Sequence, residues 1–238
     1  MTATSRRLLW PSLMTFVMLL VLLGLGSWQV KRLFWKEAIL AQIARAEAAD
    51  PVPLAAGRDV PSPFMKVSVT GTYLADETAL YGAEVQDIPS GPTMGAQLIE
   101  AMKQTNGGVI LIDRGWVPLT RSRPLDDPAG VVTVAGYVRF GDTAGWFSAA
   151  DDPAARRFFT LDPKAIGPAI GQPDVRPFVL VALGAATRQG PIVDRWPEPA
   201  RHLPRPPNNH LAYAITWYGL AVALLAIFVI WAGKGSRA

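Results

Sequence analysis

Two long stretches without charged side chains, one near each end of the chain, constrain the fold more than any other feature. The first runs from Leu8 to Val30 and the second from Leu211 to Gly233, and each is 23 residues long. A helix of about 20 apolar residues crosses the hydrocarbon core of a bilayer, where its backbone must satisfy its own hydrogen bonds. The stretches therefore predict two transmembrane helices, in preference to two buried core helices. Tryptophan marks the ends of these stretches, as is typical of membrane interfaces: Trp10, Trp28, Trp217 and Trp231.

The charges predict how the two spans are oriented. The formal charge of +4 equals the four basic residues of the tails 1–7 and 234–238, which contain no acidic residue. The segment 31–210 carries 19 basic and 19 acidic residues and is neutral. Basic residues also flank the membrane on the loop side, but a segment this long translocates largely regardless of its charge. We therefore expect both tails to be cytoplasmic. The sequence pI near 9.6 then reflects this topology and does not indicate nucleic-acid binding.

The N-terminal tail, the edge of the first span and the lack of cysteine predict the compartment and exclude several kinds of chemistry. Seven residues precede the first span, too few for an amphipathic transit peptide, and the basic edge after the span lacks a signal-peptidase site. We expect a bacterial inner-membrane protein with two spans and a periplasmic domain at 31–210. The chain has no cysteine, which excludes disulfides, thiol chemistry and thiolate metal sites.

The periplasmic segment divides into three parts. Residues 31–49 are rich in helix formers and predict a helical extension of the first span, which Pro51 and Pro53 end. Residues 64–185 predict a β-rich core, because runs of alternating or continuous apolar residues are separated by glycine and proline. Residues 197–207 contain five prolines and predict an extended linker back to the membrane. The expected fold class is α+β: two terminal transmembrane helices that flank a mainly antiparallel sandwich or open barrel.

Several segments of the core carry more specific expectations. Strands are predicted at 64–73, 78–85, 94–102, 108–113, 131–140 and 178–183, with a short helix at 163–170. Gly71 inside the first strand indicates a bulge or a close backbone contact. Trp116, after the most apolar strand, is expected either to cap the core or to form a docking surface.

No catalytic motif stands out in the sequence. His202 and His210 are the only histidines, and neither has a partner at metal-ligand spacing. The paired aspartates at 126–127 and 151–152 each precede proline, which is first a turn signal and only then a cation site. We therefore do not expect an enzyme.

The outer membrane boundary is the candidate site. On a helix, His210 shares a face with Tyr213 and Trp217, while Trp28, Gln29 and Arg32 share a face at the matching edge of the first span. Such a set suits a flat apolar ligand with anionic edges. Haem fits this description, with histidine as axial ligand and Arg32 or Arg205 on the propionates. Interfacial histidine, tryptophan and tyrosine are equally typical of simple membrane anchors.

Three stretches resemble the Surfeit locus protein 1 (Shy-type) family of cytochrome c oxidase assembly factors. They are Leu25-Gly26-Ser27-Trp28-Gln29-Val30-Lys31-Arg32-Leu33-Phe34-Trp35-Lys36, Ile110-Leu111-Ile112-Asp113-Arg114-Gly115-Trp116-Val117-Pro118 and Asn209-His210-Leu211-Ala212-Tyr213-Ala214-Ile215-Thr216-Trp217-Tyr218-Gly219-Leu220-Ala221. Their order and spacing agree with the family along nearly the whole chain. One departure is Asp113, where the family pattern usually has asparagine.

The resemblance implies an assembly role for an aa3-type oxidase, in which the protein assists haem a insertion into the catalytic subunit. It implies transient haem a binding with His210 as the iron ligand. The candidate residues beside it are those of the boundary cluster, Trp217, Tyr213, Trp28, Gln29 and Arg32. Subunit I of the oxidase, haem a synthase and membrane lipid are the implied partners. A scaffold that stabilises an oxidase subunit without binding haem remains the alternative.

Overall fold

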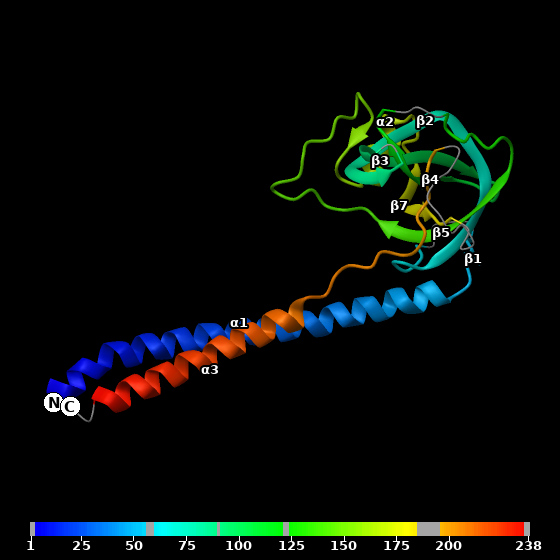
Figure 1. The fold of residues 1–238 in the computed structure, drawn as a ribbon. Coiled ribbons are helices and arrows are strands. Elements are labelled where there is room, and N and C mark those ends of the chain that lie inside the picture. The colour runs from blue at the N-terminus through cyan, green and yellow to red at the C-terminus, as the bar shows by residue number, and fades with distance from the viewer. Residues whose placement is uncertain (1–2, 56–59, 90, 121–123, 185–195, 236–238) are drawn as a thin grey trace. The chain divides into compact units, whose positions relative to one another are not determined.

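The computed structural model describes residues 3–55, 60–89, 91–120, 124–184 and 196–235 (Figure 1). The chain forms two compact units. One comprises Met1–Gln42 and Arg205–Ala238, and the other comprises Ile43–Pro204.

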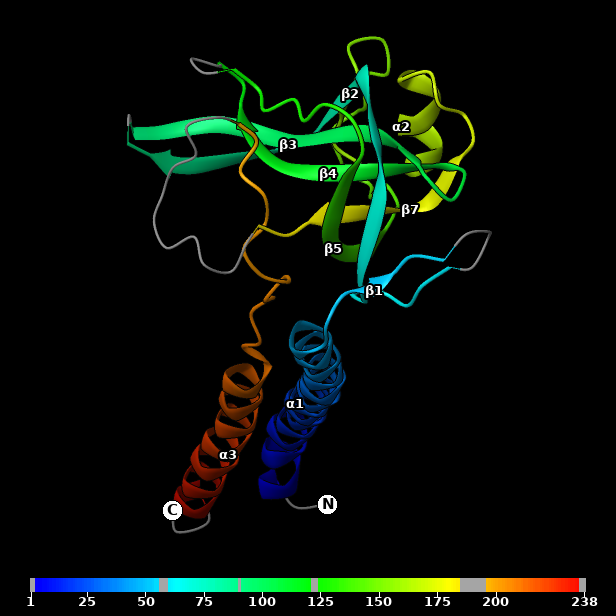
Figure 2. The ribbon, with the colours of Figure 1, turned by 90° about the vertical axis from the view of Figure 1, so that its right-hand side faces the viewer.

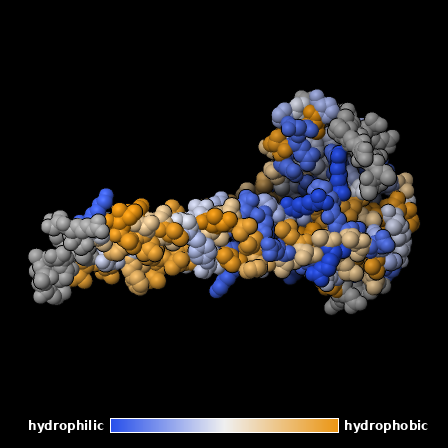
Figure 3. All heavy atoms as spheres, turned by 60° about the horizontal axis from the view of Figure 1, so that its bottom comes forward, coloured by the Kyte–Doolittle hydropathy of each residue, from blue (hydrophilic) through white to orange (hydrophobic). Residues whose placement is uncertain are grey.

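The first unit consists of two helices, α1 (Ala3–Ala48) and α3 (His210–Gly235). Both are long and apolar enough to cross a membrane, and large apolar side chains are exposed along both. These side chains form most of the helix surface in Figure 3. An exposed apolar surface on a long helix is what a lipid environment requires. The helical extension predicted at 31–49 is the continuation of α1, whose last turn belongs to the second unit.

The second unit is built on one mixed sheet. Its elements are β1 (Val52–Pro53), β2 (Lys66–Ile88), β3 (Gly91–Gln104), β4 (Val109–Pro118), β5 (Val132–Phe140), β6 (Arg157–Phe158), α2 (Pro163–Ala169) and β7 (Val175–Ala182). The strand order is β1-β2-β3-β4-β7-β5, and β2 also pairs with β5. Five strands thus close into a barrel, seen in two views in Figures 1 and 2. The pairing is antiparallel except between β4 and β7 and at the short strands β1 and β6.

Closure depends on the length and bending of β2. Its first residues, Lys66–Gly71, pair with β5, and the strand continues from Gly71 along β3. A methyl group on Gly71 would collide with the carbonyl oxygen of Lys103, so the expected close backbone contact is present. Two predicted strands, 64–73 and 78–85, are one strand here. A register shift between Tyr73 and Thr78 bulges it without ending it.

Two apolar clusters occupy opposite faces of this sheet. One draws on all five barrel strands and fills the interior, with Val69, Met102, Ile112, Val138 and Leu180 among its buried members. The neighbouring residues in β3, β4 and β7 face outward. They form a second cluster with Phe158, Leu161, Ile166 and Ile170, so residues 158–170 cover that outer face.

The chain returns across the barrel before it reaches α3. Trp116 and Glu198 exchange two backbone hydrogen bonds of 2.9 Å, and Leu203 is buried. Trp116 itself is buried and packs edge-on against Trp196, with 5.4 Å between the ring centroids. Trp116 therefore caps the core. Of the proline-rich stretch 197–207, the part up to Leu203 lies on the barrel.

Candidate ligand site at the membrane boundary

Small residues allow α1 and α3 to approach each other. Gly26 of α1 is buried, as are Ala214 and Ala221 of α3. A methyl group on Gly26 would lie 2.8 Å from the Tyr218 ring, and the Tyr218 hydroxyl lies 3.1 Å from Ser27 Oγ. Small residues and interhelical hydrogen bonds are the usual means of helix association in lipid. The two helices therefore pack against each other along one face of each.

The central contact of this face joins His210 to Gln29. His210 is the first residue of α3, and its Nδ1 lies 2.8 Å from Gln29 Oε1 of α1. Because an amide oxygen only accepts hydrogen bonds, this contact requires a proton on Nδ1, and of the two neutral tautomers it selects the Nδ1–H form. The lone pair is then on Nε2. A partner that fixes the tautomer and orientation of a histidine in this way is typical of metal-ligating imidazoles.

An unsatisfied acceptor lies close by in the chain. Asn208 Oδ1 is buried and has no hydrogen-bond partner among the residues that the structure describes. Buried polar atoms are rarely left in this state. A donor from a bound molecule would satisfy it.

The remaining residues of the predicted site lie on other faces. Tyr213 and Trp28 are 55% and 52% exposed, and Trp217 is half-buried. The Arg32 guanidinium lies 4.6 Å from the ring centroid of Trp35 on its own helix. The structure thus brings together His210 and Gln29, and it leaves Trp28, Tyr213 and Arg32 on the outer surface of the helix pair.

Two residues absent from the predicted set, Leu22 and Gly26, also contribute to the helix contact. Leu22, Gly26 and Gln29 of α1 recur at spacings of four and three residues and face α3, whereas Gly24 is open. This recurrence is the signal that would have identified the face. In the described part of the chain, no three histidine or acidic residues come together as a metal site.

A second polar site lies on the outer face of the barrel, inside a cavity of about 380 Å³. The buried carboxyl of Asp113 lines it and accepts a 3.0 Å hydrogen bond from the Gly115 N–H. Burial raises the pKa of Asp113 to about 7, and Gly115 and the nearby Arg139 oppose that rise. Burial likewise raises the pKa of Tyr137 in the same cavity to about 12.

A buried ion pair crosses the barrel interior next to this cavity. Arg114 Nη1 lies 2.5 Å from Glu100 Oε2, and its guanidinium stacks on the Tyr73 ring at 4.6 Å. Burial raises the pKa of Glu100 although Arg114 opposes it. Asp151 Oδ1, from one of the predicted aspartate pairs, accepts hydrogen bonds from the Phe159 and Thr160 backbone. This carboxylate therefore has a structural role at a turn.

The fold and the site define a membrane-anchored β-barrel protein in which a histidine and a glutamine meet on its two candidate membrane helices. A sequence profile described as the SURF1 family matches residues 16–222, a range that includes both residues. The chain belongs to the SURF1 family.

Individual relatives match over most of their length. A SURF1-like protein of Monosiga brevicollis is 29% identical over 232 residues, covering 91% of this chain and 85% of that protein. A SURF1-like protein of Rickettsia conorii is 28% identical over 92% of this chain and 89% of its own. Surfeit locus protein 1 of Homo sapiens is 28% identical over 89% of this chain and 75% of its own.

Proposed function

We propose that this protein is an assembly factor for an aa3-type cytochrome c oxidase. It assists insertion of haem a into the catalytic subunit by holding haem a transiently at the outer membrane boundary. The observation that carries the proposal is the 2.8 Å contact between His210 Nδ1 and Gln29 Oε1, which directs the ring proton away from Nε2. Membership of the SURF1 family supports the oxidase as the destination.

Residues near the His210 end of the helix pair suit a flat cargo with an acidic edge. Nε2 of His210 would ligate the iron, and Gln29 would keep the ring in its binding tautomer. The exposed rings of Trp28 and Tyr213 offer apolar contact on the lipid side. Arg32 or Arg205 would pair with the propionates. Haem a would supply the iron for this ligation, and holding it would require no covalent change in the haem or in the protein.

A carrier must also release its cargo. A single protein ligand and rings that lie open to lipid favour a weaker site than a fully enclosed pocket. Lateral release into subunit I of the oxidase then does not require a lid to open. Haem a synthase is the proposed donor and subunit I the proposed acceptor. The role is that of a carrier, without catalysis.

The topology belongs to the same proposal. Both tails are placed in the cytoplasm, and the barrel domain in the periplasm of a bacterial inner membrane. The basic tails and the two candidate membrane helices support this orientation. The candidate site then lies at the periplasmic leaflet.

A second candidate function is a scaffold that stabilises an oxidase subunit without binding haem. The same contact favours it, because the Gln29 side chain and the His210 ring tie α1 to α3 without any ligand. The two functions differ in what a change at His210 does to bound pigment.

Absorption spectroscopy separates them. We would purify the wild type, His210→Ala and His202→Ala from cells that make haem a. His202 is the other histidine of the chain and is exposed on the barrel domain, which makes its variant the matched control. The proposal expects a haem a spectrum in the wild type and in His202→Ala, and loss of most of that pigment in His210→Ala.

Other outcomes argue against haem binding. A full, unshifted spectrum in His210→Ala would remove His210 as the ligand. Absence of pigment from the wild type, with oxidase assembly intact in His210→Ala, would favour the scaffold.

A further inference from the structure

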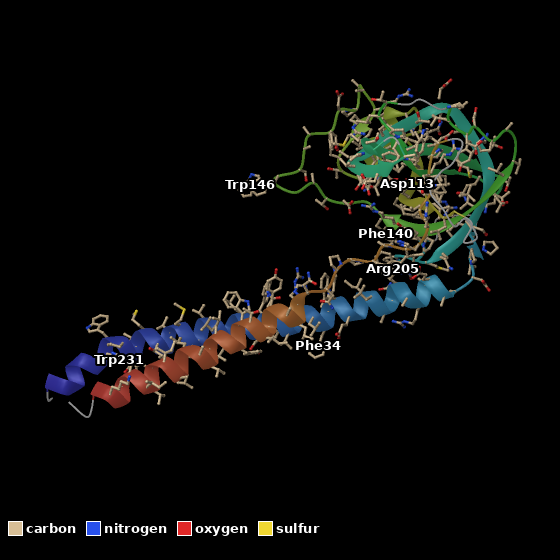
Figure 4. All side chains as sticks on the ribbon, in the orientation of Figure 1. Phe34, Asp113, Phe140, Trp146, Arg205 and Trp231 are labelled. Carbon is tan, nitrogen blue, oxygen red and sulfur yellow. The ribbon has the colours of Figure 1, made fainter. Side chains whose placement is uncertain are left out.

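The loop between β5 and β6 presents two aromatic rings to solvent. Trp146 is 99% exposed and Phe147 is 102% exposed. Trp146 projects from the body of the domain on this loop in Figure 4. Other large aromatic residues of the domain, such as Trp116, Phe158 and Phe178, are buried. Complete exposure of two adjacent rings is costly in water and indicates a contact surface.

The base of the loop is fixed to the barrel at both ends. At one end, the Asp142 N–H donates to the Leu161 carbonyl at 2.8 Å, and its carboxylate pairs with Arg139 at 2.8 Å. At the other end, Asp151 accepts the hydrogen bonds from Phe159 and Thr160 described above. The two acidic residues nearest the tip thus have partners in the domain. The loop does not hang freely from the barrel.

The tip of the loop is a closed turn. The Ser148 N–H donates to the Gly145 carbonyl at 3.0 Å, and the Gly145 N–H donates to Ser148 Oγ at 2.8 Å. Trp146 and Phe147 are the two central residues of this turn. The reciprocal bonds satisfy the turn's own backbone and turn both rings outward.

The composition of the tip points to lipid as its partner. Residues 143–150 carry no charge and, apart from the two rings, consist of small residues. Tryptophan prefers the headgroup region of a bilayer, where the ring is apolar on one side and its N–H remains wet. The domain is continuous at both ends with the helical unit that carries the two candidate membrane spans, so it is tethered to the bilayer that those spans would cross.

We propose that Trp146 and Phe147 insert into the interface of the membrane that holds α1 and α3. The loop is a third attachment of the barrel domain, beside its two covalent connections. Because the tip has no basic residue, insertion depends on apolar contact and not on anionic lipid. The third attachment limits rotation of the domain about its tethers. This inference is independent of haem binding.

A fluorescent label tests the insertion in the full chain. The protein has no cysteine, so Trp146→Cys can be labelled with an environment-sensitive dye such as NBD. Ala129→Cys provides an equally labelled control at an exposed position of another loop. Both proteins are reconstituted into vesicles of zwitterionic lipid, with and without nitroxide-bearing lipid.

We expect nitroxide lipid to quench most of the emission from position 146 and aqueous iodide to quench little of it. Position 129 should show the reverse. Adding Phe147→Ser to the labelled Trp146→Cys protein should reduce lipid quenching several-fold, because the second ring no longer inserts. Vesicles with anionic lipid should give the same quenching as zwitterionic ones.

Two results would overturn the proposal. One is iodide quenching at 146 that equals the quenching at 129, together with no effect of nitroxide lipid. The other is protection of position 146 that arises only when the purified oxidase subunit is added, which would make the tip a protein-docking surface.

Discussion

His210 is half-buried and Asp113 is buried, and both can titrate. They differ in how well neighbouring groups compensate for their burial. The ring of His210 has a partner that determines which nitrogen is protonated. The Asp113 carboxyl has the Gly115 N–H and the nearby Arg139 guanidinium against the larger cost of burial. Burial disfavours the charged form of such a carboxyl, so a pKa of about 7 leaves it only partly ionised at neutral pH. Stability should therefore respond to pH at Asp113.

The sign of that response is fixed by the direction of the shift. In the unfolded chain Asp113 loses its proton near pH 3.8, but in the folded chain the pKa is about 7. Between these values the folded state binds more protons, so the free energy of unfolding falls as pH rises from about 4 to about 7. Above pH 7 the penalty stays constant, at up to about 4 kcal/mol.

Asp113→Asn should remove this dependence. An amide at position 113 still accepts the Gly115 N–H, and it carries no charge to bury. We expect the variant to be more stable than the wild type at pH 8 and close to it at pH 4, measured by urea unfolding of the full chain in detergent. A residual slope from Glu100, whose pKa is also raised by burial, should persist. Exposed Asp87→Asn is the control, and an unchanged pH slope in Asp113→Asn would contradict the assignment.

The return segment 196–203 is the element whose position depends most on a single backbone feature. It crosses β4 at Gly115, whose φ is +117°, and a methyl group there would collide with the Glu198 carbonyl. Gly130 also has a positive φ, of +80°, but nothing lies within 4 Å of its added methyl group. Substitution of Gly130 therefore tests backbone strain alone, whereas substitution of Gly115 tests backbone strain together with the contact between β4 and the return segment.

Gly115→Ala and Gly130→Ala should differ accordingly. Gly130→Ala should cost about 1–2 kcal/mol, because of its left-handed backbone alone. Gly115→Ala should cost more, since the strand also has to release the return segment and the two Trp116–Glu198 hydrogen bonds. The edge-on pair of Trp116 and Trp196 gives a circular dichroism signal that should weaken in Gly115→Ala and persist in Gly130→Ala. Equal losses in both variants would show that the return segment adds nothing.

The sequence predicts an element well when residues close together in the chain determine it, and poorly when distant segments do. The two spans, the extension of α1 and the continuous apolar run of β4 follow from composition along a few turns or one strand. Closure of the barrel does not, because Lys66–Gly71 pair with Val132–Tyr137, more than 60 residues away in the chain. Neither does the place of β7 between β4 and β5, for which no local pattern exists.

The candidate site shows the same division. Helical spacing and the membrane boundary suffice to select His210 and Gln29. They do not determine the rotation of each helix, because helices that are apolar on all sides offer no preferred face. The predicted cluster therefore includes Trp28, which is exposed, and omits Gly26 and Tyr218, which meet across the helices.

At the scale of the whole molecule, the orientation in the membrane can be tested without a ligand. Because the chain has no cysteine, Ala83→Cys on exposed β2 and Ser5→Cys in the N-terminal tail each give a single reactive thiol. We expect a membrane-impermeant maleimide to label position 83 in intact spheroplasts, and position 5 only after lysis. Labelling of position 5 before lysis would place the tails outside the cytoplasm.

The position of β7 in the barrel has a consequence for truncated chains. Among the strands of the described residues, β7 is synthesised last, yet it lies between β4 and β5 and pairs with both. A chain that stops before Val175 leaves two long strand edges with unpaired backbone groups, which invite aggregation and proteolysis. A late stop codon should therefore remove the barrel domain along with α3, and not merely release an otherwise intact domain from its second tether.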